Sequence, residues 1–507
     1  MKKSLITLCM LATLLSGCSF IPDFMRPKAP VAGQWPNAQS TGGVQAASDK
    51  PASEIGWREF FVDEKLRKVI ELALNNNRDL RISALNIERA RAQYQITSAS
   101  LFPAINASGN ANIQKRGENS SGNDNLSNIT NNGVIQQSNG AAGGISRNYR
   151  AGVSFSNYEL DFFGRIRSLR EQSLQLYLAT EEARRSAHIA LIAEVANAWL
   201  TLQADKERLK LAQDTLQSQQ SSYDLNKARF DIGIANGLDL QQSQISVDTA
   251  KVDVARFTSQ IQQDENALVL LIGSALPAEL HPDQPLQAAT ILAELPAGMP
   301  SAVLQQRPDV LQAEYNLLAA NANIGAARAA FFPTIALTAS VGSASDELNS
   351  LFSAGTGFWN FVPQITVPIF NAGRNRANLE SAKIDRDINL NQYEKAIQVA
   401  FREVADSLAI RQTLTEQFSA QSSLVDASSE TYRLSEARYK SGIDNYLTVL
   451  DSQRTLYVAQ QNLIALRLIA FSNQVTLYKA LGGGWKEFTD QRNIDSDVKN
   501  DVKINSD

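Results

Sequence analysis

Hydrophobic and polar residues alternate over four short stretches of this 507-residue chain, near residues 105–113, 149–156, 335–342 and 365–369. A period of two residues is typical of a strand with one buried face. The same pattern suits a barrel strand in a membrane, with its apolar face toward lipid and its polar face toward a water-filled lumen. A small sheet on a soluble core is the alternative interpretation. Aromatic residues near the ends of these stretches, such as Trp359, favour the membrane.

Two much longer stretches, 165–230 and 374–441, contain neither glycine nor proline. In the first, His188, Val195 and Leu202 are spaced by seven residues, which is the repeat of a coiled coil. A helix of this length measures about 100 Å. A glycine-containing turn follows each stretch, and a return helix then runs to about Leu271 or Leu481. The pattern predicts two antiparallel helical hairpins, and it leaves open whether they enclose a channel or form a rod.

The chain repeats itself. Phe102-Pro103 recurs 230 positions later as Phe332-Pro333, and Glu194-Val195-Ala196 recurs 209 positions later as Glu403-Val404-Ala405. The offset falls by 21 because the first copy carries an extra stretch rich in Asn, Gly and Ser at 117–144. A constant offset over many positions indicates an internal duplication.

The duplication divides the chain into six segments. They are a signal peptide (1–17), an N-terminal arm (18–62), the first repeat (63–273), a Pro-rich connection (274–306), the second repeat (307–485) and a polar C-terminal tail (486–507).

The first 17 residues have the features of a secretory signal peptide, with Lys2 and Lys3 before an apolar run of about a dozen residues. The run ends in Leu15-Ser16-Gly17-Cys18, which resembles a bacterial lipobox. That resemblance implies cleavage before Cys18 and attachment of diacylglycerol and an N-acyl chain to it. It also implies that Ser19, rather than Asp, directs the anchor to the outer membrane.

Composition disfavours an enzyme and a nucleic-acid-binding protein. The net charge is −4, without the basic excess that nucleic acid requires. Two cysteines and two histidines offer little for a disulfide framework, a metal site or His-based catalysis. His188 lies on an apolar helical face and is predicted to be packed, and His281, beside Pro282, has no evident partner. The sequence therefore predicts no catalytic residue, no metal and no cofactor other than the lipid on Cys18.

Four strands are too few to close a barrel, and lipid does not tolerate an open sheet edge. Bacterial barrels begin at about eight strands, so several chains must contribute to one barrel. Membrane insertion therefore requires oligomerisation.

With these features the sequence resembles the TolC-like outer membrane efflux proteins, and most closely the OprM-type lipoproteins of multidrug pumps. The likeness covers 18–485, and it implies that the N-terminal arm (18–62) includes the start of an equatorial region, to which the Pro-rich connection (274–306) also belongs. Beyond the lipobox and the duplicated plan, the matching motifs are Ile55-Gly56-Trp57-Arg58-Glu59-Phe60-Phe61, Glu159-Leu160-Asp161, Asn266-Ala267-Leu268, Arg307-Pro308-Asp309 and Leu481-Gly482-Gly483-Gly484-Trp485.

The resemblance implies an α+β membrane protein. It implies a homotrimer in which four strands per chain form one 12-stranded outer-membrane β-barrel, continuous with a periplasmic α-helical coiled-coil barrel. The implied function is a passive, gated exit duct for drugs and other small toxic compounds, working with a periplasmic adaptor protein and an inner-membrane RND pump. The outer-membrane conduit of a type I protein secretion system is the alternative, and a structural lipoprotein that tethers the envelope is a further one.

The resemblance also implies two kinds of site. The periplasmic gate lies just after the second hairpin turn, at Leu447, Asp451 and Arg454, with Leu238 and Asp239 of the first copy nearby. Three Asp451 carboxylates would form an acidic ring that attracts cations, and Arg454 is placed to pair with it. The adaptor-docking tips are Gly233, Ile234, Ala235, Gly442, Ile443 and Asp444.

Overall fold

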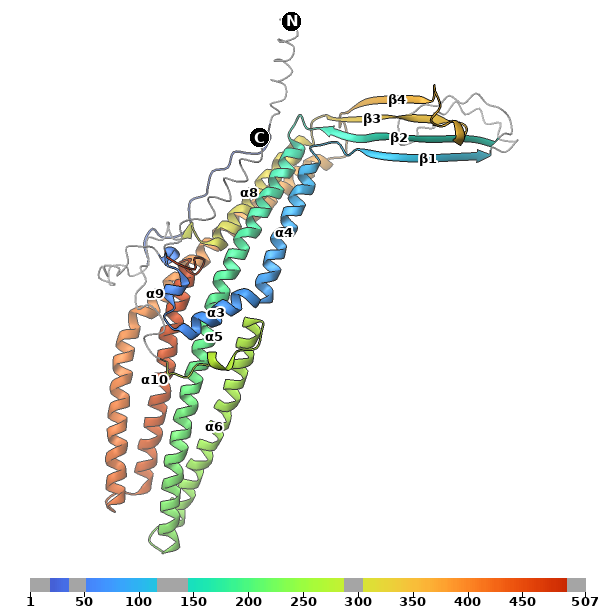
Figure 1. Cartoon of the computed structure of the whole chain (residues 1–507). Helices are drawn as coiled ribbons and strands as arrows, with labels where there is room; N and C mark the ends of the chain where they lie inside the picture. The colour runs from blue at the N-terminus through green and yellow to red at the C-terminus, as the bar shows by residue number, and fades with distance from the viewer. Residues whose placement is uncertain (1–18, 36–51, 116–144, 287–303, 490–507) are drawn as a thin grey trace. The chain divides into compact units, whose positions relative to one another are not determined.

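The computed structural model describes residues 19–35, 52–115, 145–286 and 304–489 (Figure 1). Predictions for Cys18, for the insertion at 117–144 and for most of the Pro-rich connection fall outside these residues. The elements in chain order are η1 (Ala52–Glu54), α2 (Trp57–Phe60), α3 (Glu64–Asn76), α4 (Arg78–Ala99), β1 (Asn106–Lys115), β2 (Ile145–Leu160), α5 (Arg165–Asp231), α6 (Gly237–Ile272), η2 (Ala278–Leu280), α8 (Pro308–Ala329), β3 (Thr334–Ser345), η4 (Leu348–Ser350), β4 (Gly357–Thr366), α9 (Arg374–Lys440) and α10 (Tyr446–Ala480).

The chain divides into two compact units. One, the sheet unit, comprises 1–27, 88–179 and 314–392; the other, the hairpin unit, comprises 28–87, 180–313 and 393–507. No helix in the described residues combines the length and the apolar character needed to cross a membrane.

The sheet unit contains one antiparallel sheet in the order β1-β2-β3-β4 (Figure 1). Its register pairs Ala107 with Val153, Val153 with Val341, and Val341 with Trp359, so these side chains share one face. The predicted alternation is therefore confirmed, and β4 ends at Thr366, short of the predicted Ile369. Among the described residues, the outer edges of β1 and β4 have no strand partner.

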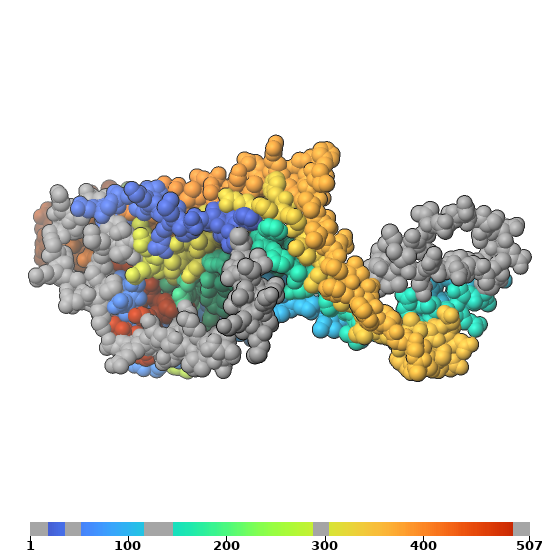
Figure 2. Space-filling model, turned by 90° about the horizontal axis from the view of Figure 1, so that it is seen from above, coloured from blue at the N-terminus to red at the C-terminus, as the bar shows by residue number. Residues whose placement is uncertain are grey.

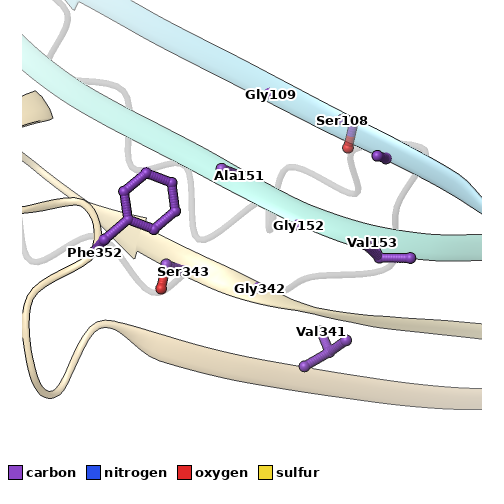
Figure 3. A pocket seen from close by; sticks show the side chains of 10 residues that line it. Ser108, Gly109, Ala151, Gly152, Val153, Val341, Gly342, Ser343 and Phe352 are labelled. Carbon is purple, nitrogen blue, oxygen red and sulfur yellow. The ribbon is translucent and has the colours of Figure 1, made fainter.

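The strands β2 and β3 approach each other closely where Gly152 faces Gly342. A Cβ atom on either glycine would collide with the backbone of the opposite strand. Small residues of β1, β2 and β3 therefore leave a shallow hollow at this point, bordered by Phe352 (Figure 3).

The N-terminal segment of the sheet unit lies along α8, as Figure 2 shows with the segment in blue and α8 in yellow. Arg26 forms two hydrogen bonds to the carboxylate of Glu314, at 2.8 and 2.6 Å. The ring of Phe20 stacks on Phe332 with 4.7 Å between centroids. Gly325 allows the close approach, since a Cβ there would lie 2.7 Å from Ile21.

The hairpin unit is built from the predicted helical hairpins, α5 with α6 and α9 with α10. Val195 and Leu202 of the heptad pattern are fully buried. The short helix α3 packs against α6, and the carboxylate of its N-cap residue, Asp63, accepts hydrogen bonds from two backbone N–H groups.

Part of the predicted polar tail is packed against this unit. The backbone N–H of Trp57 donates to the carbonyl of Lys486 at 2.9 Å, and Arg58 pairs with Glu487 at 2.6 Å. Lys486–Thr489 therefore belong to the folded structure.

Candidate functional site: the two hairpin turns

The two hairpin turns have the same backbone geometry. Gly233 and Gly442 adopt φ angles of 77° and 74°, in the left-handed region that favours glycine. The next N–H, of Ile234 or Ile443, donates to the carbonyl of Arg229 or Arg438 at 2.8 and 2.9 Å. This is a helix C-cap of the Schellman type.

The helices that follow are capped in the same way. The Asn236 side chain accepts a hydrogen bond from the N–H of Asp239 at 2.8 Å, and Asn445 accepts one from the N–H of Thr448 at 3.2 Å. Each turn thus contains Gly-Ile-x-Asn, in which glycine ends one helix and asparagine begins the next.

Apolar side chains at both turns are exposed. Ile234 is 67% exposed and its counterpart Ile443 is 64% exposed; Leu238 and its counterpart Leu447 are 64% and 54% exposed. The predicted docking and gate residues at these positions are therefore exposed in the single chain, as contact with a partner would require.

The variable position of the turn gives the two hairpins different electrostatics. Asp444 forms two hydrogen bonds with Arg438, at 2.6 and 3.0 Å, and this partner lowers the pKa of the carboxyl group. Ala235, the counterpart of Asp444, cannot pair with Arg229. The Arg229 guanidinium instead lies 5.0 Å from the ring centroid of Tyr439, on the other hairpin.

A tyrosine cluster beneath the second turn connects the hairpins. Tyr439 and Tyr446 are buried with Val449 and Leu450. The Tyr439 hydroxyl donates to Oδ1 of Asn226 on α5 at 2.6 Å. Burial raises the pKa of Tyr446 to about 12, so its hydroxyl keeps its proton at physiological pH. Sequence reasoning missed this cluster.

A further tyrosine joins the return helices: the Tyr457 hydroxyl on α10 donates to Oδ2 of Asp253 on α6 at 3.0 Å. For the tyrosine cluster beneath the second turn, the available sequence signal was the seven-residue spacing of Tyr432 and Tyr439, which places both rings on one face of α9. Tyr432 packs against that cluster.

The predicted gate residues begin the return helices. The first turns of α10 contain Leu447, Asp451 and Arg454 at helical spacing. The first turn of α6 contains Leu238 and Asp239. Asp451 and Arg454 are both exposed, and no ion pair joins them in the described chain. Asp239 lies near enough to Tyr439 to raise the pKa of that hydroxyl, after the larger effect of burial.

The two histidines differ from each other. His188 packs edge-on against Trp485 with 5.1 Å between centroids, and burial lowers its pKa to about 4, so it is neutral. The prediction that His281 lacks a partner is wrong: its Nδ1 lies 3.1 Å from Oε1 of Glu265, because the loop after α6 folds back onto that helix. No group of three potential metal ligands occurs in the described part of the chain.

Comparison with known proteins decides the family. The family model described as "Outer membrane efflux protein" matches residues 69–274 and 299–483. The chain belongs to this family. It is 49% identical over 500 residues to the probable efflux pump outer membrane protein TtgC of Pseudomonas putida, covering 98% of this chain and 99% of that protein. It is also 42% identical to the cation efflux system protein CusC of Escherichia coli, over 94% and 98% of the two chains.

Solved structures support the same family assignment. The open state of the Neisseria gonorrhoeae MtrE outer membrane channel matches with a TM-score of 0.81 at 38% identity, covering 94% of this chain and all of that one. The α+β fold and the resemblance drawn from the sequence are thus confirmed. This protein is an efflux component of the outer membrane.

Proposed function

We propose that three copies of this chain form one passive, gated duct through which a tripartite pump exports drugs and other small toxic compounds. The observation that carries the proposal is the sheet. One face of it is apolar and exposed, as at Trp359 (80% exposed) and Ile365 (66%), while the opposite face carries amides and hydroxyls. A sheet with this alternation suits lipid on one side and water on the other.

The open edges of β1 and β4 require neighbours, because unpaired backbone groups are costly in lipid. Twelve strands from three copies would satisfy them and leave an aqueous lumen. A second copy supplies the partner edge at each boundary, so the assembly closes without a second kind of chain.

The duplication indicates how the copies would pair. Within one chain, β2 of the first repeat pairs with β3 of the second, with Tyr158 opposite Leu337. Moving Tyr158 forward by 209 positions gives Val367, and moving Leu337 back by 230 gives Ala107. We therefore expect Val367 of one copy to lie opposite Ala107 of the next.

The arm that follows Cys18 supports a lipid anchor. Phe20 stacks on Phe332, which stacks in turn on Phe163 at 4.9 Å, just before β3 begins. An acylated Cys18 would leave this aromatic stack two residues from the lipid. Two or more acyl chains are needed for stable anchoring, which the diacylglycerol and N-acyl chain supply.

The exposed hairpin turns would contact the partners. Ile234 and Ile443 would dock the periplasmic adaptor of an RND pump, while Leu447, Asp451 and Arg454, with Leu238 and Asp239, would narrow the duct. Leucine side chains close a pore by packing and dewetting, and a ring of aspartates attracts cations. The duct performs no catalysis, and energy comes from the inner-membrane pump.

Planar-bilayer recording of the purified full-length protein tests the proposal. Discrete, long-lived conductance steps from a particle with the mass of three chains are expected. A monomer, or a trimer without conductance, would support a structural tether instead.

A further inference from the structure

The polar face of the sheet is almost without charge. From the register, this face presents Asn106, Ser108, Asn110, Asn112 and Gln114 of β1, Ser146, Asn148, Arg150, Gly152 and Ser154 of β2, Thr338, Ser340, Gly342 and Ala344 of β3, and Phe358, Asn360, Val362 and Gln364 of β4. Glu159, opposite Ala336 near the end of β2, lies on the same face and is paired with Arg165, so Arg150 is the one ionised side chain of this face in the described strands that has no ion-pair partner. An isolated charge in a neutral, hydrogen-bonding surface dominates the local potential.

Arg150 occupies a fixed place in this surface. It lies opposite Asn110 of β1 and Ala344 of β3, and its Nε donates to Oδ1 of Asn148 at 2.8 Å. No carboxylate of the described residues lies within ion-pair distance of its guanidinium. The remaining N–H groups of the guanidinium can therefore bind a solute.

None of the acids on or next to this face forms an ion pair with Arg150 in the described part of the chain. Glu159, on the same face near the end of β2, is held by Arg165 through two hydrogen bonds of 2.6 and 2.8 Å. Asp346 and Glu347 follow the end of β3 and are exposed. Arg147, only three residues from Arg150, lies opposite Ile113 on the other, apolar face.

We propose that Arg150 is a selectivity residue of the duct that attracts and transiently binds anionic solutes carrying carboxylate, phosphate or sulfonate groups. The inference rests on the proposed function, which turns the polar face toward the lumen and brings three copies of Arg150 to one level. A ring of arginines favours anions in a pore, and the planar guanidinium can bind such groups through two hydrogen bonds. The surrounding amides and hydroxyls bind solutes without charge preference, so Arg150 sets the charge preference of the barrel, separately from the Asp451 ring expected at the gate.

Reversal potentials in a KCl gradient across a planar bilayer test this. In the full-length protein, Arg150→Gln should lower the chloride-to-potassium permeability ratio by about twofold, and Arg150→Glu should lower it further. Arg147→Gln is the matched control, since it removes the same charge from the same strand on the opposite face, and it should leave the ratio within error. The difference between wild type and Arg150→Gln should shrink at 1 M salt, where screening is short-ranged.

The outcomes separate the two proposals. Conducting trimers whose permeability ratio is the same for wild type, Arg150→Gln and Arg150→Glu would overturn the role of Arg150 and leave the duct intact. A wild-type protein that forms no conducting trimer would overturn the duct itself. An equal shift in the Arg147→Gln control would assign the effect to overall charge and would also overturn the role of Arg150.

Discussion

The guanidinium of Arg307 donates a hydrogen bond to the carbonyl oxygen of Ala480 at 2.8 Å, where α10 ends. In the first repeat, the side-chain amide of Asn77 donates to the carbonyl of Leu271 at the same distance. Arg307 and Asn77 are 230 positions apart, and Ala480 and Leu271 are 209 apart, which are the two offsets of the duplication. The repeats have thus kept one helix-capping contact while changing the side chain that makes it.

Replacing Arg307 should destabilise the hairpin unit strongly. Arg307 is buried and also pairs with Asp309 at 2.7 Å and Glu403 at 2.8 Å. Arg307→Met would leave two partly exposed carboxylates and the buried Ala480 carbonyl without their donor, at a cost of about 2 to 3 kcal/mol. Thermal unfolding of the detergent-purified protein measures the loss. The control Arg433→Met breaks the exposed pair with Glu430 and should cost less than about 1 kcal/mol. Equal melting temperatures for the two variants would show that the contacts of Arg307 do not stabilise the hairpin unit.

Paired cysteines should cross-link neighbouring copies at the predicted register. Ala107→Cys together with Val367→Cys brings two Cβ atoms opposite each other between chains, within the range that a disulfide spans. Covalent dimers and trimers should then appear on non-reducing gels after mild oxidation. The mismatched pair Ala107→Cys with Phe361→Cys keeps the same face but shifts the register by six residues, so it should stay monomeric. Cross-linking of the mismatched pair alone would contradict the register.

Polar substitution at the turn isoleucines should abolish export without closing the duct. Ile443→Asp places a charge in the surface that we expect the adaptor to cover, and a charge buried without a partner costs several kcal/mol. Dye efflux in cells should fall to the level of the deletion strain, while trimer yield and bilayer conductance stay unchanged. Ser441→Asp adds the same charge two residues away and serves as control. Full efflux by Ile443→Asp would exclude this turn from docking.

Shortening or neutralising a side chain at the gate should make the duct leaky. Leu447→Ala removes an exposed apolar side chain from the first turn of α10, and Asp451→Asn removes the charge of the expected acidic ring. Each should raise the open probability in bilayers about severalfold, and Asp451→Asn should also reduce block by divalent cations. Leu424→Ala, at a leucine of similar exposure on α9 away from the turns, should behave as wild type. Unchanged openings in both gate variants would place the constriction elsewhere.

The first hairpin should be more stable in mild acid because of Asp264. Its carboxyl group is buried in α6 and faces Asp205 of α5, whose own partner is Arg208 at 2.6 Å. Burial, with a further contribution from Asp205, raises the pKa of Asp264 to about 6. The folded protein therefore binds this proton more tightly than the unfolded chain. This contribution to stability is present at low pH and is lost as the pH rises toward about 6.

Asp264→Asn removes the titration. The variant should be more stable than wild type by about 1–2 kcal/mol at pH 8 and should match it near pH 4. Melting temperatures at the two pH values measure the difference, and Asp214→Asn, which alters an exposed carboxylate, is the control. A variant that is less stable than wild type at pH 8 would show that Asp264 is needed as a charged group.

Much of the fold was predictable because its signals are local. Alternation at 335–342 predicts which residues share each face of β3. Gly233 and Gly442 follow the ends of long helices that contain neither glycine nor proline. The contact of the tyrosine cluster with Asn226 was not predictable, because it depends on which segments far apart in sequence pack together. The contact of His281 with Glu265 spans only 16 residues, but it depends on how the loop after α6 folds back onto that helix. The same holds for Arg150. Its face follows from the pattern, but its lack of a carboxylate partner required the register of three strands.

The most direct test of the central claim is the accumulation of a fluorescent cationic dye in cells that lack this gene and have no redundant homologue. The account predicts raised accumulation, restored to the parental level by a plasmid carrying the wild-type gene but not by one carrying Ile443→Asp. Accumulation that is unchanged by the deletion would contradict the drug-export function, even if the purified protein formed conducting trimers.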